Sequence, residues 1–159
     1  MTEPQPNIPF AEGPFLQTAV ICERVLEEKD SVKTAVRMID RVNRTAYGSS
    51  PPQDMAPFKQ TLTALLRFKS GSARGPMEIQ LRLQKPSGES PSPQRYTVHF
   101  EGDADRGVDL IVGMEVEFDL PGLHWFDVYL DGIRITRMPM RVVYLPQVMQ
   151  QIGQPPEHQ

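Results

Sequence analysis

The strongest constraint on this chain is a hairpin signal in residues 123–146, which read LHWFDVYLDGIRITRMPMRVVYLP. An aromatic run precedes Asp131 and Gly132, and a β-branched run follows them. Asp-Gly in this setting is the strongest short-range hairpin signal, because a type I′ turn needs a positive φ at both central residues and this pair tolerates it. The chain therefore contains at least one pair of antiparallel strands.

Alternation of apolar and polar residues predicts further strands in the middle of the chain. Residues 77–84 (MEIQLRLQ) alternate without error, and 58–69, 95–101 and 108–120 show the same period. A period of two is typical of strands with one buried face and one wet face, as in antiparallel sheets. The residues expected to point inward are Leu62, Ala64, Leu66, Phe68, Met77, Ile79, Leu81, Leu83, Tyr96, Val98, Phe100, Leu110, Val112, Met114, Val116 and Phe118.

Two earlier segments, 16–27 and 32–42, fit either a helix or a strand by apolar spacing. Their β-branched content and the short connection between them favour a hairpin of two long strands. Residues 43–57 are predicted to be a loop, because prolines exclude regular structure there. Pro139 removes a backbone donor, so the last strand is expected to be an edge or to carry a bulge.

These segments together predict one all-β domain over residues 15–146, with a disordered arm at 1–14 and a tail at 147–159 that forms one helical turn at 147–152. The length of 159 residues suits a single domain. About eight strands with turn signals between them indicate an antiparallel β-sandwich, broadly immunoglobulin-like.

The charge and cysteine content exclude several classes of protein. The formal net charge is -3 and the estimated pI is about 5.6, so the clustered basic charge that nucleic acid or anionic lipid requires is not expected. No run of about 18 apolar residues is present, and the first residues do not resemble a signal peptide. Cys22, the single cysteine, is expected to pack as a small hydrophobe, which fits a reducing cytoplasm.

No catalytic site and no cofactor are predicted. The three histidines are His99, His124 and His158. His99 and His124 are expected to face solvent from strands, and His158 lies in the tail. Serines cluster in loops without a nucleophile elbow. Catalysis needs a nucleophile, a base and an orienting group that meet in space, and no such motif is found.

An acidic loop at residues 101–109 suggests an alternative function, a calcium-dependent binding domain. Its carboxylates are Glu101, Asp103, Asp105 and Asp109, and Gly107 could supply a tight turn. The bidentate Glu of an EF-hand is missing, and Arg106 adds a positive charge. Because turns commonly use Asp and Gly, the favoured interpretation is a turn without metal.

A second acidic group, Glu115, Glu117 and Asp119, is expected on the outward face of one strand. Cross-strand ion pairs would relieve their repulsion, and Arg134 or Arg137 are the expected partners. The group is interpreted as a solvated face, with an acidic recognition surface as the alternative.

Trp125, Asp127 and Tyr129 form the candidate protein-binding site. On a strand they share one face, while Phe126 and neighbours at the same parity face the core. Large aromatics outside a core often mark contact sites. The alternative is that they pack beneath the N-terminal arm or a long loop. An unknown protein partner is expected, either at this patch or at an edge strand, and an edge could also support a homodimer.

The opening ICERVLEEKDSVKTAVRMIDRV and the closing GLHWFDVYLDGIRITRMPMRVVY resemble a family of small uncharacterised bacterial proteins. The shared features are an opening pair of strands with an acidic residue after Cys and a late W-F-D-V-x-x-D-G hairpin. The resemblance implies a bacterial cytoplasmic β-sandwich and supports strands in 16–42. It brings no activity, cofactor or catalytic residue with it.

Overall fold

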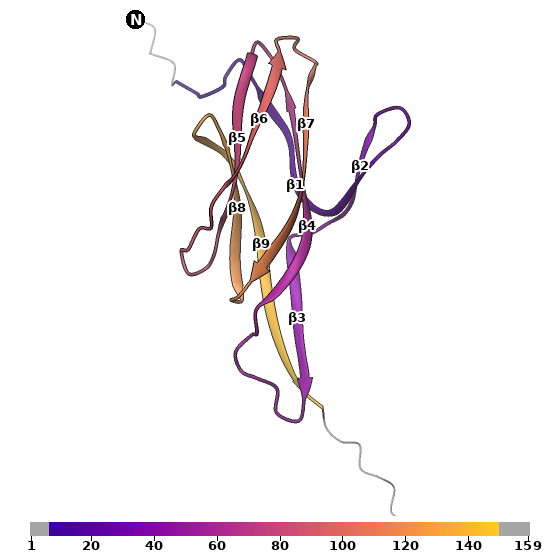
Figure 1. Ribbon diagram of the computed structural model, residues 1–159, viewed down its shortest axis with the longest axis vertical. Coiled ribbons are helices and arrows are strands. Elements are labelled where there is room, and N and C mark those ends of the chain that lie inside the picture. Colours follow the sequence, from indigo (N-terminus) through magenta and orange to yellow (C-terminus); the bar gives the residue numbers. More distant parts are fainter. Residues whose placement is uncertain (1–6, 150–159) are drawn as a thin grey trace, which may run out of the picture.

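The computed structural model describes residues 7–149, and this range contains nine strands and no helix (Figure 1). The strands are β1 (Phe15–Glu27), β2 (Lys33–Met38), β3 (Arg41–Gly48), β4 (Phe58–Lys69), β5 (Arg74–Gln84), β6 (Gln94–Glu101), β7 (Gly107–Phe118), β8 (Gly122–Leu130) and β9 (Ile133–Val148). The all-β prediction is therefore confirmed, with nine strands in place of about eight. Among these residues, no helix has the length and apolar character needed to cross a membrane.

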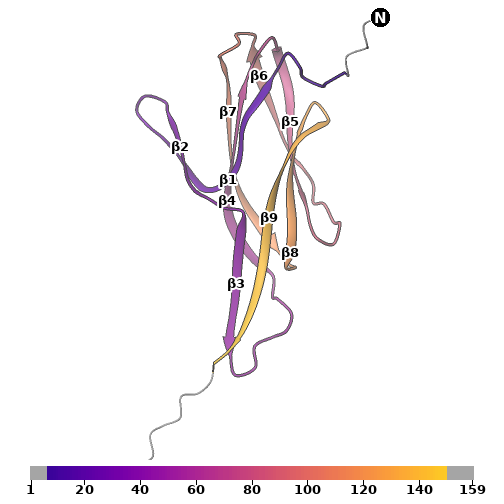
Figure 2. The ribbon, with the colours of Figure 1, turned by 180° about the vertical axis from the view of Figure 1, so that it is seen from behind.

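The strands form two sheets that share one core. One has four strands in the order β2-β1-β4-β7, and the other has five in the order β3-β9-β8-β5-β6. All neighbours are antiparallel except β3 and β9, which run parallel from Arg41↔Arg141 to Gly48↔Val148. The expectation of a purely antiparallel arrangement is wrong at this one pair. Figure 2 shows the pair extending to the lower end of the molecule.

The core follows the alternation. Most of the residues expected to point inward are buried, and Leu62, Leu66, Phe68, Phe100 and Phe118 are fully so. Met77, Leu83, Tyr96 and Leu110 are partly buried and pack against the same cluster. Because fully burying one large apolar side chain contributes about 1.5–3 kcal/mol, this interior is the main source of stability.

The opening hairpin is confirmed, but its second strand is shorter than expected. β1 and β2 pair from Glu27↔Lys33 to Cys22↔Met38. Arg37 has a φ of 54° within β2, the backbone leaves the four-stranded sheet after Met38, and β3 joins the other sheet. The prediction of one strand over 32–42 and a loop over 43–57 is therefore wrong for 41–48. These residues pair with β9, a partner one hundred residues away, so no local pattern predicts the strand.

The closing hairpin is confirmed at its turn, where the φ angles of Asp131 and Gly132 are 44° and 80°. The register between β8 and β9 shifts at Val128/Tyr129, which leaves Ile135 as the extra residue of a bulge. Pro139 pairs with Trp125 on β8, and the pairing of β9 with β3 begins only at Arg141. Pro139 thus lies on a locally free edge of a strand that is otherwise central.

The two ends of the described range differ from each other. Near the N-terminus, the carbonyl oxygen of Glu12 accepts hydrogen bonds from the backbone N and Oγ of Ser72, at 2.8 and 3.0 Å, and Phe10 packs against the core. At the other end, Gln147 and Val148 continue β9. The helical turn expected at 147–152 is wrong for these two residues, and 150–159 lie outside the described residues.

Candidate functional site

The candidate residues Trp125, Asp127 and Tyr129 lie on the outer face of the five-stranded sheet. Their neighbours of opposite parity on β8 form the inner face, and Phe126, Val128 and Leu130 are 1%, 0% and 0% exposed, as predicted. Trp125 and Tyr129 are half-buried, whereas Asp127 is buried. The strand alternation therefore assigns this face correctly.

Three adjacent strands contribute to the face. On β5, Gln80, Arg82 and Gln84 stand opposite Tyr129, Asp127 and Trp125, respectively. On β9, Arg134 and Arg137 stand opposite Tyr129 and Asp127. We call this set of eight residues the arginine–aromatic face.

The guanidinium group of an arginine lies over each of the two aromatic rings on this face. The guanidinium carbon of Arg137 lies 4.3 Å from the centroid of the Trp125 ring, and that of Arg82 lies 4.2 Å from the centroid of Tyr129. Such contacts are worth about 0.5–1 kcal/mol at exposed sites and more when desolvated. The rings are thus covered by arginines of neighbouring strands, and the N-terminal arm docks on Ser72 instead. Arm residues 9–14 come near the face only at its border, where Pro9, Phe10 and Pro14 line a hollow together with Arg134.

Asp127 anchors the arginines. Its Oδ1 accepts a hydrogen bond from Nε of Arg137 at 2.7 Å, and its Oδ2 lies 3.5 Å from Nη2 of the same residue. Arg134 approaches Oδ2 at 4.0 Å, and Arg137 also donates to Oε1 of Gln84 at 2.7 Å. A buried carboxylate with this planar partner fixes the guanidinium against Trp125.

A second network orders the other half of the face. Arg82 donates from Nε and Nη2 to Oε1 of Gln80, at 3.1 and 2.7 Å. Gln80 in turn donates to Glu78, which also pairs with Arg95 at 3.4 Å. The hydrogen bond from Gln80 lowers the pKa of the Glu78 carboxyl. Both stacked arginines are therefore held in place by hydrogen bonds within the chain.

The two histidines on strands behave differently. His99 is exposed, as expected, but His124 is fully buried, so its predicted solvent-facing position is wrong. Its ring packs edge-on against Phe118 with centroids 4.9 Å apart, and Nδ1 lies 3.2 Å from the carbonyl oxygen of Gly122. The parity that sends Phe126 inward also sends His124 inward, so the sequence did carry this signal.

Burial lowers the pKa of His124 below its ordinary value. Above about pH 6.5 the imidazole is neutral in both the folded and the unfolded chain and has no effect on stability. Below that pH the unfolded chain takes up a proton that the folded chain resists, so the free energy of unfolding falls with pH by at most about 1.4 kcal/mol per unit. We expect urea unfolding between about pH 7 and pH 5 to show this loss.

The matched controls for this titration are His124→Leu and His99→Gln. The first should flatten the pH dependence, and the second should leave it unchanged because His99 is exposed. An unaltered slope in the His124 variant would show that another group dominates this window.

The carboxylates of the acidic loop at 101–109 form ion pairs with arginines and do not converge on one point. Asp109 pairs with Arg67 at 2.9 Å, and Arg106 pairs with Glu101 at 3.0 Å and with Asp103 at 3.6 Å. In residues 7–149, no three His, Cys, Asp or Glu side chains are grouped so that they could hold a metal ion. The loop therefore does not show the several oxygens converging on one point that a hard cation needs.

The second acidic group has partners other than those expected. Lys59 pairs with Glu115 at 3.1 Å, and Lys85 pairs with Asp119 at 3.2 Å. Arg134 and Arg137 lie on the other sheet, so their predicted role as partners is wrong. The Lys85 hydrogen bond lowers the pKa of the Asp119 carboxyl.

Cys22 is fully buried in β1, which confirms its predicted packing as a small hydrophobe. Burial raises the pKa of its thiol. The thiol is therefore kept protonated and is a poor nucleophile.

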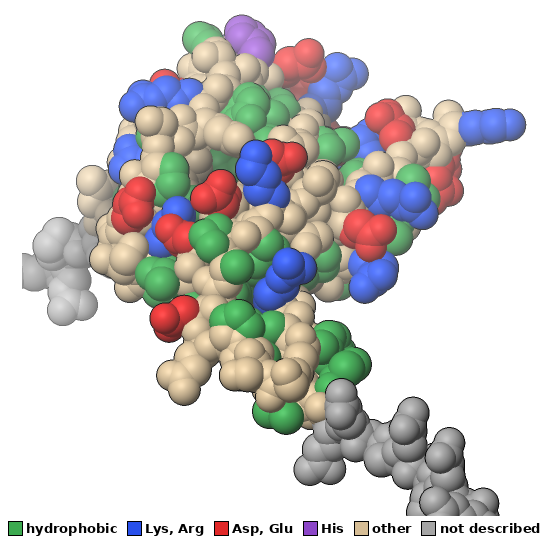
Figure 3. Space-filling model, turned by 60° about the horizontal axis from the view of Figure 1, so that its bottom comes forward, with side chains coloured by type: hydrophobic (Ala, Val, Ile, Leu, Met, Phe, Trp, Pro, Cys, Tyr) green, Lys and Arg blue, Asp and Glu red, His purple; other side chains and the backbone are tan. Residues whose placement is uncertain are grey.

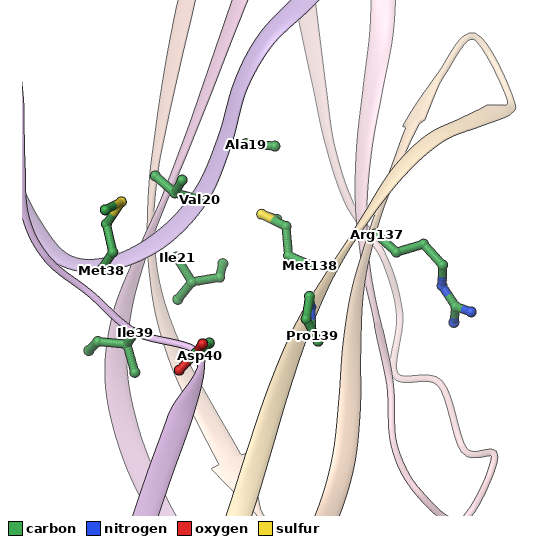
Figure 4. A pocket seen from close by; sticks show the side chains of 9 residues that line it. All are labelled: Ala19, Val20, Ile21, Met38, Ile39, Asp40, Arg137, Met138 and Pro139. Atoms are coloured by element: carbon green, nitrogen blue, oxygen red, sulfur yellow. The ribbon is translucent and has the colours of Figure 1, made fainter.

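Among the grooves between the two sheets in residues 7–149, the first to consider, of about 420 Å³, lies between β1 and β9 (Figure 4). Ala19, Ile21 and Met138 point into it, whereas Arg137 points away, toward the arginine–aromatic face. The second, of about 260 Å³, lies between β7 and the β5–β6 connection. His124 lines neither groove.

Other exposed apolar side chains gather at the lower end of the molecule, where β3 and β9 end. Figure 3 shows apolar groups there, with acidic and basic side chains mixed over the rest of the same view. Tyr47, Leu145 and Val148 are 62%, 41% and 65% exposed. Both signs of charge share this view, and no single-sign field dominates it.

The structure thus defines an all-β chain with two sheets and an ordered cationic–aromatic outer face. A family model for a family of unknown function, DUF6941, matches residues 17–143. The chain belongs to this family, in agreement with its resemblance to an uncharacterised domain family. A search of curated proteins finds no match.

Two solved structures share some similarity with the chain. One is alkylpurine DNA glycosylase AlkC of Pseudomonas fluorescens bound to DNA containing an abasic site analog, with 11% identity, a TM-score of 0.39, and coverage of 79% of this chain and 30% of that chain. The other is β-glucosidase from Listeria innocua in complex with glucose, with 14% identity, a TM-score of 0.39, and coverage of 67% and 15%. The chain spans less than a third of either protein, and similarity this low carries no argument about function.

Proposed function

We propose that this protein is a non-enzymatic interaction module of the cytoplasm that binds a protein partner through the arginine–aromatic face. The observation that carries the proposal is the pair of stacks, Arg137 on Trp125 and Arg82 on Tyr129. Trp, Tyr and Arg are the residues most enriched at interface hot spots. Because hydrogen bonds to Asp127 and Gln80 already fix both arginines, binding costs less side-chain entropy.

We further infer that the fold is an immunoglobulin-like sandwich. The order β9-β8-β5-β6 matches strands G-F-C-C′ of that fold, and β1-β4-β7 matches A-B-E. In this interpretation the N-terminal part of the chain contributes to both sheets, with β1 in the first sheet and β3 in the second, where β3 pairs in parallel with β9. The arginine–aromatic face is then the outer face of the G-F-C sheet.

A binding role also agrees with the distribution of titratable groups. The buried imidazole of His124 packs against Phe118 and lines neither groove. The buried carboxylate of Asp127 is occupied by Arg137. These groups therefore stabilise the fold and lack the shared cleft in which an acid and a base would act together.

The test replaces both aromatics, as Trp125→Ala with Tyr129→Ser. We expect the partner recovered by affinity purification with the wild-type chain to bind the double variant at least about tenfold more weakly, because truncating an anchor residue commonly costs more than 1 kcal/mol. Circular dichroism should show an unchanged strand spectrum, since the inner face of β8 is untouched.

The matched control is Leu26→Ser, which removes an exposed apolar side chain from the opposite sheet and should leave binding intact. Unchanged binding and unchanged self-association in the Trp125/Tyr129 variant would exclude this face as the contact surface. Unfolding of that variant would show that the aromatics act in stability, and Arg82→Glu would then test the face with both rings in place.

A further inference from the structure

β7 presents a long free edge. It pairs with β4 over its full length, from Lys69↔Gly107 to Phe58↔Phe118, and no other described strand pairs with it. In an antiparallel strand, alternate residues direct their backbone groups to the unpaired side. Proteins commonly block such an edge with proline, a bulge or an inward-pointing charge, and β7 has none of these.

An apolar groove of about 260 Å³ runs beside this edge. Its floor comes from both sheets and consists of Leu81, Leu83, Met114, Val116 and Phe126. Pro91 and Ser92, in the β5–β6 connection, line it as well. The volume falls below the range of about 300–1,000 Å³ typical of small-molecule sites, so the groove suits a few aliphatic side chains better than a free ligand.

The rim of the groove is acidic on the β7 side. Glu115 and Glu117 both line it and both are exposed. Glu115 pairs with Lys59, whereas none of the side chains in residues 7–149 forms an ion pair with Glu117. Lys85, the basic residue of the lining, is already paired with Asp119. The rim therefore favours lysine or arginine on whatever lies against it.

We propose that β7 accepts an added strand from another protein, an extended segment with aliphatic residues at every second position and lysine or arginine between them. The free backbone edge selects an extended chain, since only a strand can pair with the whole row of donors and acceptors. The aliphatic side chains enter the groove, and the basic ones lie beside Glu115 and Glu117. A second copy fits less well, because edge-to-edge pairing of two β7 strands places both acidic sets on one face of the joined sheet.

The probe is a capped peptide of about eight residues that alternates valine and lysine, which is long enough for an ordinary strand. Binding is followed by chemical shifts of the ¹⁵N-labelled full chain. We expect saturable binding with a Kd below about 1 mM, with shifts concentrated in β7 and the groove lining. A valine–glutamate peptide should bind at least about tenfold more weakly, and so should a valine–lysine peptide with a central proline.

Two variants locate the site. Ser92→Trp should obstruct the mouth of the groove from an exposed loop position and weaken binding about tenfold, while Ser50→Trp, an exposed serine elsewhere, should not. Glu117→Lys should weaken the valine–lysine peptide and strengthen the valine–glutamate one. If Ser92→Trp lowers the melting temperature, Glu117→Lys alone decides the location.

Four results would overturn the proposal. They are no binding of the valine–lysine peptide up to millimolar concentration, equal binding of the two charge forms, shifts confined to the arginine–aromatic face, and a dimer in which β7 is protected without peptide. The last would identify a second copy as the occupant. The arginine–aromatic face is a separate surface, so any of these leaves its own test intact.

Discussion

Replacing Gly107 with alanine is expected to lower the free energy of unfolding by about 3 kcal/mol. This is the upper end of the destabilisation that single substitutions commonly cause, because the added methyl group would be packed against atoms that cannot easily move. A Cβ at this position would overlap the carbonyl oxygen of Phe68. That atom belongs to the backbone of β4, next to the Lys69↔Gly107 pair where β7 begins. The overlap can be relieved only by moving backbone at the start of the longest ladder in the four-stranded sheet. Urea unfolding at one pH measures the cost.

Gly113→Ala is the matched control, since it lies on the same strand and a Cβ there meets nothing within 4 Å. The free energy of unfolding of this variant should differ from that of the wild-type chain by no more than about 0.5 kcal/mol, as for most substitutions at exposed positions. Equal losses in the two variants would mean that β7 is sensitive to alanine as such and that the contact with Phe68 has no special role. A neutral Gly107→Ala variant would show that the two strands separate there at little cost.

The strands of the middle of the chain were predictable because each has one wet face. Leu62, Leu66 and Phe68 alternate with polar residues, and a shift of one residue would expose all of them, so the pattern fixes which side is buried. The same alternation along β8 placed Trp125 and Tyr129 on the outer face and Phe126 on the inner face. Local alternation was enough to predict which face of a strand is buried, because that assignment does not depend on which strand lies beside it.

β3 was missed because its structure depends on a distant partner. Residues 43–48 read NRTAYG, which has no clean alternation, and proline follows soon after. Their strand forms by parallel pairing with the end of β9. Parallel partners are far apart in sequence by necessity, so a local pattern cannot identify them.

The candidate site was predictable only in part, for a similar reason. The face of Trp125, Asp127 and Tyr129 follows from parity along one strand. The arginines that cover the rings come from β5 and β9, and their positions depend on register between strands. The error over Arg134 as a partner of the acidic strand has the same origin, because the sequence does not say which sheet a strand joins.

Removal of Arg137 is the substitution that tests the arginine–aromatic face as a physical unit. Arg137→Ala is expected to lower the free energy of unfolding by about 2–3 kcal/mol, because among the described side chains it leaves Asp127, which is 5% exposed, with Arg134 at 4.0 Å as its one ionic partner. The loss stays below the 3–5 kcal/mol typical of fully buried pairs, since the Arg137 side chain is itself 31% exposed. Trp125 would also lose the guanidinium stacked on its ring. Urea unfolding measures the loss.

A control and a rescue separate charge pairing from general damage. Arg95→Ala removes an exposed arginine from the neighbouring strand, paired with Glu78 at 3.4 Å, and should cost less than about 1 kcal/mol. The double variant Asp127→Leu with Arg137→Met removes both charges and should recover most of the stability, because a buried carboxylate without its partner is the main cost. A double variant no more stable than Arg137→Ala would mean that the stack on Trp125, and not the charge of Asp127, holds this face together.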